Sequence, residues 1–274
     1  MSIAMSHARI APRDIRFKSD DALSKDWNGG DAFRTAFFNS MSILFPYGEK
    51  SFIDSVRAQA EKITDERLKQ DIRGFMAQES IHRREHQRFN ELLCSARGYD
   101  LDYLEKSIRE DMKAVNGLDP LFWLATTVAY EHLTSTIAHC LLTQESWLRG
   151  ADPSVAKIWR WHAIEEIEHK SVAFDVYFAV GGTRAQLRKV MLLMSWEFLG
   201  LYMFRNVVHM LGRNKTPLGV TLKSAASFLL GKHGLFRANW NSYWMFFARD
   251  FHPTRIDDRE LLQRSIAAEQ LALA

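Results

Sequence analysis

Residues 159–177 read WRWHAIEEIEHKSVAFDVY and place charged groups on what is otherwise an apolar helix face. His162, Glu166 and His169 lie at i, i+4 and i+7, and on an α-helix these offsets bring the three side chains onto one face. An isolated charge buried in hydrocarbon is strongly destabilising, so these groups need compensation. A bound metal ion is the simplest compensation, and it needs further ligands from other parts of the chain. The apolar residues of the same face are Val155, Ile158, Ala173 and Val176.

A second helical stretch carries the same interruption. Asp65 is expected to cap a helix that runs to about Arg97. The apolar face of this helix contains Glu79 and His82, spaced as Glu-x-x-His, and His86 follows one turn later. A glutamate and a histidine three residues apart project from one face of a helix, where both can reach a metal.

The two halves of the chain repeat one arrangement, in which a single glutamate lies on one helix and Glu-x-x-His lies on the next. Two such helix pairs are the ligand set of a ferritin-like di-iron or di-manganese bundle. Two divalent cations would also neutralise the four carboxylates. The alternative, buried Glu–His ion pairs without metal, would leave four desolvated carboxylates held only by imidazoles. In sequence order the ligand candidates are Glu49, Glu79, His82, Glu131, Glu166 and His169.

Three neighbouring residues leave alternatives open. His162 adds a third histidine, and His86 is either a further ligand or a residue that supports one. Glu165 competes with Glu166, which is preferred because it reproduces the Glu-x-x-His spacing of the first half. The carboxylates expected to hold histidine N–H groups or arginines around the site are Glu85, Glu165, Glu168 and Asp175.

Start and stop signals predict an all-α chain, because strand alternation is nearly absent. Asp-Pro pairs at 119–120 and 152–153 open two long helices, with the aspartate as cap and the proline in the first turn. Phe45-Pro46-Tyr47-Gly48 is expected to end one helix and to let another begin at or near Glu49. The predicted helices span approximately residues 32–44, 49–63, 66–97, 101–115, 120–150, 153–181, 184–211, 218–230, 240–251 and 256–273.

These helices are expected to pack as one structural domain with three parts. Residues 1–30, with Pro12, Gly29 and Gly30 as breakers, would form an irregular N-terminal arm. Residues 31–182 would form the ferritin-like four-helix bundle, and residues 183–274 would form additional C-terminal helices packed on it.

Charge, cysteine content and the N-terminal residues indicate which binding partners and which cellular compartment to expect. The net charge of +3 in 274 residues gives no support for nucleic-acid binding. Cys94 and Cys140 lie in helical stretches without a neighbour at metal or redox spacing, so reduced buried thiols in a cytoplasmic protein are expected. The N-terminus has no uninterrupted apolar run of the kind that a secretory signal needs.

Residues 190–204 form the most apolar window of the chain. The window is about five residues short of a ~20-residue membrane span and contains Glu197. A buried helix is the first interpretation, and peripheral contact with a membrane surface is the alternative. The helix could also wall a substrate channel with Trp196, Tyr202 and Phe204, while Arg205 would bind a substrate carboxylate or pair with Glu197.

Two family resemblances rest on these residues. The ligand pattern from Glu49 to Lys170, with His162 as a seventh ligand, resembles the di-iron arylamine N-oxygenases of the p-aminobenzoate N-oxygenase type. The phrases FPYGEKSF, FMAQESIHRREHQRFN and WHAIEEIEHKSVAFDVY resemble the bacterial "predicted metal-dependent hydrolase" family along most of the chain. The second resemblance implies hydrolysis, whereas the ligand pattern favours oxygen chemistry.

The resulting hypothesis is an O2-dependent dinuclear oxidoreductase or oxygenase that acts on a small hydrophobic or aromatic substrate. Carboxylate and imidazole ligands favour iron, then manganese, over zinc. The enzyme would need O2 and an external electron donor, and a homodimer is one expected oligomeric state. Two alternatives are a hydrolase that activates a metal-bridging water and a ferritin-like iron-handling protein. The ~90 C-terminal residues speak against iron storage, since a bare four-helix cage subunit would not need them.

Overall fold

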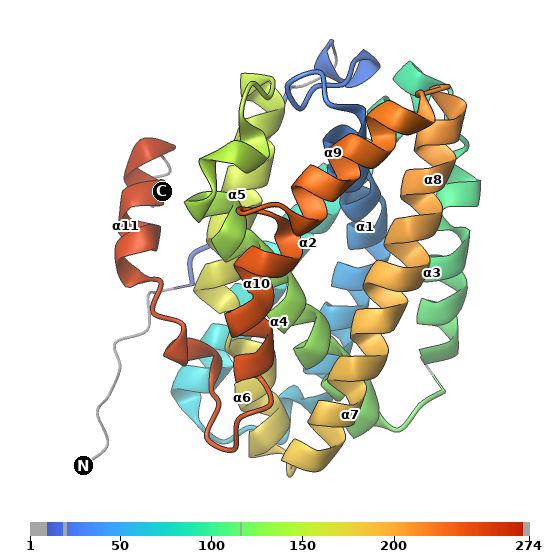
Figure 1. The fold of residues 1–274 in the computed structure, drawn as a ribbon. Coiled ribbons are helices and arrows are strands. Elements are labelled where there is room, and N and C mark those ends of the chain that lie inside the picture. Colours follow the sequence, from blue (N-terminus) through green and yellow to red (C-terminus); the bar gives the residue numbers. More distant parts are fainter. Residues whose placement is uncertain (1–9, 19–20, 116, 271–274) are drawn as a thin grey trace.

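The computed structural model describes residues 10–18, 21–115 and 117–270, and it is helical without a strand over these residues (Figure 1). An isolated bridge joins Asn28 to Ala151. The predicted all-α class is therefore confirmed, and the arrangement is compatible with a ferritin-like bundle. The four longest helices are α1 (Ala32–Ala60), α2 (Glu66–Arg97), α4 (Pro120–Thr143) and α5 (Pro153–His169).

The predicted aspartate caps are present. The Asp65 carboxylate accepts a hydrogen bond from the Leu68 N–H at 2.9 Å and begins α2. Asp119 and Asp152 accept in the same way at the starts of α4 and α5, each followed by proline. Gly98 ends α2 with φ 63°, the left-handed conformation in which glycine has no steric cost.

The predicted break at residues 45–48 is wrong, because α1 continues through Pro46. Proline has no N–H, so the Ser42 carbonyl four residues earlier loses its usual donor within the helix. The Asn90 side-chain amide on α2 donates to that carbonyl at 2.8 Å and replaces the missing bond. The neighbouring helix therefore compensates for the proline, and Glu49 lies in the interior of α1 rather than in a first turn.

Two other helices end earlier than predicted. Helix α4 ends at Thr143, and the 3-10 turn η2 (Glu145–Leu148) follows it. The helix predicted for 153–181 is two helices, α5 and α6 (Val172–Ala179), separated by a turn at Lys170 and Ser171. His169 is consequently the last residue of α5.

The C-terminal third differs from the prediction in its details. The helix predicted for 184–211 consists of α7 (Arg184–Ser195), the π-helical segment η3 (Trp196–Met203) and α8 (Phe204–Arg213). Helices α3 (Leu101–Val115) and α9 (Leu218–Leu230) have the predicted bounds. The end predicted at residue 273 lies outside the described residues. The other elements are α10 (Leu235–Met245), α11 (Arg259–Ala268), η1 (Ala22–Ser24) and η4 (Pro253–Arg255).

The C-terminal helices cover the outside of the bundle. Figure 1 shows α11 beside α5, and α9 and α10 lying across the face that also carries α7 and α8. Buried apolar residues from the bundle and from these helices form one continuous core. None of the described helices is long and apolar enough to cross a membrane. Cys94 and Cys140 are free and buried, as predicted.

Helix α9 is attached to the bundle mainly by one side chain. Phe228 is its only buried residue, and its ring lies 5.0 Å from that of Phe37 on α1 and 5.3 Å from that of Trp147. Phe228→Ala is therefore expected to lower the free energy of unfolding by about 3–5 kcal/mol and to expose α9 to proteases. Urea unfolding and limited proteolysis measure both effects. Leu230→Ala, at an exposed position of the same helix, should leave both unchanged.

Candidate metal centre

Seven of the predicted ligand residues converge inside the four-helix interior. Helix α1 supplies one of them, α2 two, α4 one and α5 three. Each is no more than 4% exposed. The seven residues are Glu49, Glu79, His82, Glu131, His162, Glu166 and His169.

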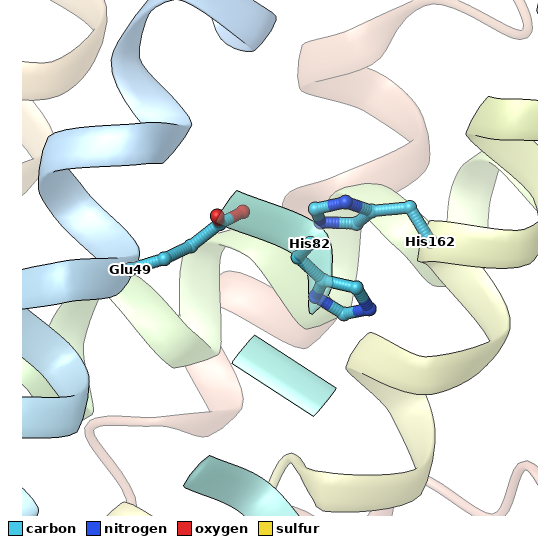
Figure 2. A group of neighbouring side chains, drawn as sticks. All are labelled: Glu49, His82 and His162. Carbon is cyan, nitrogen blue, oxygen red and sulfur yellow. The ribbon is translucent and has the colours of Figure 1, made fainter. Parts of the chain in front are cut away.

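The first group consists of Glu49, His82 and His162. Figure 2 shows the Glu49 carboxylate on α1 pointing toward the two imidazoles, which come from α2 and α5. One potential ligand atom of each residue lies within 4.8 Å of the other two. Three donors at this spacing, drawn from three helices, could hold one metal ion.

The second group consists of Glu79, Glu166 and His169, whose ligand atoms also lie within 4.8 Å of one another. His169 Nε2 is 3.0 Å from Glu79 Oε1 and 3.5 Å from Glu131 Oε2, so Glu131 lies at the edge of this group. The two residues of the Glu79–His82 motif therefore face different groups.

Glu166 lies between the two groups. Its Oε1 atom is 3.1 Å from His162 Nε2, 3.5 Å from His82 Nδ1 and 3.5 Å from His169 Nε2. A carboxylate surrounded by imidazoles of both groups is placed to bridge two cations. The geometry therefore gives the central position to Glu166 rather than to Glu49 or Glu131.

A chain of hydrogen bonds determines which ring nitrogen of His162 carries the proton. The Ser42 hydroxyl donates to Asn90 Oδ1 at 2.7 Å, so Ser42 Oγ accepts from His86 Nδ1 at 2.8 Å. Burial lowers the pKa of His86 well below its usual value, and His86 is therefore neutral with an acceptor at Nε2. His162 Nδ1 donates to that atom at 2.8 Å. His162 Nε2 is left with its lone pair directed at Glu166.

The other two imidazoles are fixed in the same way. His169 Nδ1 donates to Gln78 Oε1 at 2.9 Å, because the Gln78 amide nitrogen is already donating to Glu168. His82 Nε2 lies 3.1 Å from Glu165 Oε2 and donates to it. In each ring the second nitrogen faces the carboxylates of the site, as in metal sites where an outer partner sets the tautomer.

Most of the candidate ligand atoms have no hydrogen-bond partner among the described residues. Within the described part of the chain, both carboxylate oxygens of Glu49, Glu79 and Glu131 lack a partner, and so does Glu166 Oε2. Lone pairs that face carboxylate oxygens repel them unless a proton or a metal ion lies between. Three imidazoles could not neutralise four carboxylates even if all three were protonated. The residues therefore fit two divalent cations.

The pKa shifts of the buried carboxyl groups and imidazoles also indicate a site for cations. Burial, with repulsion from Glu79, raises the pKa of Glu49 and Glu131 well above the usual glutamate value. Burial acts in the same direction on Glu166, but the nearby imidazoles of His162 and His169 hold its pKa well below that value. His82 has its pKa raised to about 10, because Glu165 and Glu166 outweigh its burial. Protons and metal ions thus compete for these groups, and metal binding is expected to release protons.

An outer layer of charged groups supports the candidate ligands. Glu165 lies outside the site, where it holds His82 and accepts hydrogen bonds from Trp161 Nε1 and from the buried Arg13. Arg13 also pairs with Glu168 at 2.7 Å. Sequence analysis missed Arg13, since it lies in the irregular arm, and missed the Ser42–Asn90 pair, whose polar residues have no distinctive spacing.

Two expectations about neighbouring residues need correction, and a third agrees with the structure. Asp175 does not hold a candidate ligand, because it pairs with His252 Nε2 at 2.8 Å. Glu85 accepts from the Phe17 N–H and pairs with arginines, as expected of an outer carboxylate. The alternative partner for Arg205, Glu197, is wrong: Arg205 bonds Ser107 Oγ and backbone carbonyls, while Glu197 accepts from Tyr202.

Fold and site together define an all-α protein with a buried cluster of carboxylates and imidazoles suited to metal ions. A family model described as "Predicted metal-dependent hydrolase" matches residues 11–257, and the chain belongs to this family. The match confirms the resemblance to that family drawn from sequence phrases. No curated protein and no solved structure matches the chain.

Removal of Glu131 tests its part in the site. Glu131→Ala is expected to lower bound metal to one ion or fewer per chain, because the second group loses a carboxylate. Elemental analysis of protein purified without chelator measures the ions, and circular dichroism should show that the helices persist. Glu91→Ala, an exposed change on α2, should keep full loading. Undiminished loading of Glu131→Ala would contradict its assignment as a ligand.

Removal of Arg13 tests the outer layer. Arg13→Met leaves Glu165 and Glu168 buried without their guanidinium partner, so the free energy of unfolding should fall by about 3–5 kcal/mol. Metal affinity should fall about 10–100-fold, since Glu165 no longer holds His82 firmly. Urea unfolding and metal competition measure the two effects. Arg16→Met is the control, because the Arg16 side chain is 61% exposed and lies 3.6 Å from Glu85. It should lower the free energy of unfolding by less than about 1 kcal/mol.

Proposed function

We propose that this chain is a dinuclear metal enzyme that uses O2 to oxidise a small hydrophobic or aromatic substrate. The observation that carries the proposal is the position of Glu166 Oε1, within 3.5 Å of imidazole nitrogens from both ligand groups. The metal ions would be held by Glu49, Glu79, His82, Glu131, His162, Glu166 and His169. His86 and Glu165 would orient His162 and His82 from outside.

Iron is the proposed metal, with manganese as the next candidate. Mixed carboxylate and imidazole ligands suit these ions, whereas structural zinc favours thiolates and fewer ligands. Neither group of potential ligand atoms contains a cysteine. Two iron(II) ions would supply two electrons to O2, and an external donor would restore them.

Aromatic side chains exclude water from the three imidazoles. Phe45 stacks on His162 with ring centroids 4.6 Å apart, and Phe75 meets His169 edge-on at 5.0 Å. Trp161 meets His82 edge-on at 4.9 Å. A dry, apolar setting of this kind would protect reactive oxygen chemistry from competing reactions with water.

A small cavity lies next to Phe45, the residue that stacks on His162 of the first ligand group. Its volume is about 30 Å³, and its mostly apolar lining includes Phe45, Gly48 and Phe52, which flank Glu49 along α1. This volume suits a molecule of the size of water or O2. Tyr130 also lines the cavity, and its buried hydroxyl has no hydrogen-bond partner among the described residues. Tyr130 is therefore available to donate to a bound molecule there.

Hydrolysis is the second candidate, and the family description favours it over oxidation. In that case the same residues would hold ions that activate a water between them for attack on an ester or phosphate.

Reaction of the reduced protein with O2 separates the candidates. Protein loaded with iron(II) without air should consume O2 in proportion to the iron bound and show a transient absorption change. Glu166→Ala should lose both, whereas Glu91→Ala should keep both. A hydrolase would show neither change and would cleave model esters with manganese or zinc bound. An iron-storage protein would instead accumulate ferric mineral far beyond two ions per chain.

A further inference from the structure

Apolar side chains are concentrated on the surface of one part of the molecule. Thirteen of the fifteen large hydrophobic residues that the described structure exposes lie between residues 192 and 244. Trp196 is 65% exposed and Phe204 is 67% exposed, so neither contributes much to the core. The thirteen residues are Leu192, Leu193, Trp196, Leu201, Phe204, Val208, Leu218, Val220, Leu222, Leu230, Phe236, Trp240 and Trp244. We call them, with the basic residues among them, the α7–α10 surface (Figure 1).

The same surface is strongly basic. Residues 184–249 contain ten Lys or Arg and a single acidic residue, Glu197, which gives them a formal charge of +9. The rest of the chain therefore carries −6, because the whole chain is +3. Glu197 is only half-exposed and accepts a hydrogen bond from Tyr202. The exposed basic residues are Lys189, Arg213, Lys215, Lys223, Lys232, Arg237 and Arg249.

An apolar pocket opens within this surface. Its volume is about 240 Å³, and it lies between α4, the junction of α7 with η3, and α10. Trp240 and Trp244 line it together with Leu199, and the Tyr243 hydroxyl is 3.1 Å from Ser195 Oγ at its wall. Exposed tryptophans around an apolar pocket are typical of side chains that enter the interface between water and lipid.

We propose that the α7–α10 surface docks on an anionic lipid membrane. Exposed apolar residues would enter the boundary between headgroups and acyl chains, while the surrounding lysines and arginines would bind lipid phosphates. The apolar pocket would accept part of a lipid acyl chain. Charge complementarity favours this partner. Residues 184–249 carry +9 and have no fully exposed acidic side chain, so a negatively charged surface attracts them.

A second copy of the chain fits this surface less well. Two copies related by a twofold axis would bring like patches together, and seven exposed cations in each would face one another without a counter-charge. Nucleic acid would match the charge but would leave the exposed leucines and tryptophans without an apolar environment.

Helix η3 connects this surface with the interior. Leu199 lines the outer pocket, whereas Phe198 and Tyr202 of the same segment line the small cavity that Phe45 also lines. Docking would therefore bring lipid to the outer face of a segment whose inner face lines a cavity one residue, Phe45, away from His162. Membrane docking does not depend on the proposed reaction, and its test is independent of metal.

Sedimentation with vesicles tests the proposal. The full chain should bind vesicles of phosphatidylcholine mixed with phosphatidylglycerol and should not bind vesicles of phosphatidylcholine alone. Binding should weaken as salt is raised, since salt screens the attraction. Trp196→Ser with Phe204→Ser, and separately Lys223→Glu with Lys232→Glu, should each lower the partition coefficient about tenfold or more.

Matched control variants show whether a loss of vesicle binding comes from the α7–α10 surface or from a general effect of the substitution. Leu118→Ser and Arg67→Glu change an exposed apolar residue and an exposed cation outside the α7–α10 surface, and both should bind as the unchanged chain does. Glu131→Ala should also bind normally, because docking needs no metal. Equal binding to neutral vesicles, no binding to anionic vesicles, or full binding by both surface double variants would overturn the proposal. So would a dimer that the apolar double variant dissociates while vesicle binding is absent.

Discussion

Mutual repulsion among four buried glutamates is the constraint around which this molecule is built. Glu49, Glu79, Glu131 and Glu166 are almost fully excluded from water, and three of them have no hydrogen bond on either carboxylate oxygen within the described structure. Water cannot stabilise their charge, and the protein provides fewer imidazoles than carboxylates. Two cations would convert this repulsion into attraction and would tie together the four helices that carry the ligands.

The surrounding polar residues hold the candidate ligands in place through hydrogen bonds. Ser42, Asn90 and His86 determine which nitrogen of His162 faces inward, and Asn90 also supplies the donor that Pro46 removes from α1. One side chain thus stabilises an irregular helix and a candidate ligand together. The N-terminal arm contributes Arg13 in a similar way, because Arg13 holds the carboxylate that holds His82.

The sequence predicted which carboxylates and imidazoles meet in the interior better than it predicted the shape of the helices that carry them. Helical spacing is local, so Glu79, His82, Glu166 and His169 could be placed from offsets alone. The passage of α1 through Pro46 depends on Asn90, 44 positions further along the chain, and local signals do not contain that contact. The separation of Glu165 from Glu166 likewise depends on Arg13, which approaches α5 from the arm. The π-helical segment η3 had no sequence signature that distinguished it from an ordinary helix.

The most direct measurement is anomalous diffraction from crystals of the protein loaded with iron. The expected result is two peaks about 3.5–4 Å apart, one among Glu49, His82 and His162 and the other among Glu79, Glu131 and His169, with Glu166 between them. Absence of metal from this interior, with the four glutamates protonated or bonded to ordered water, would contradict the central claim.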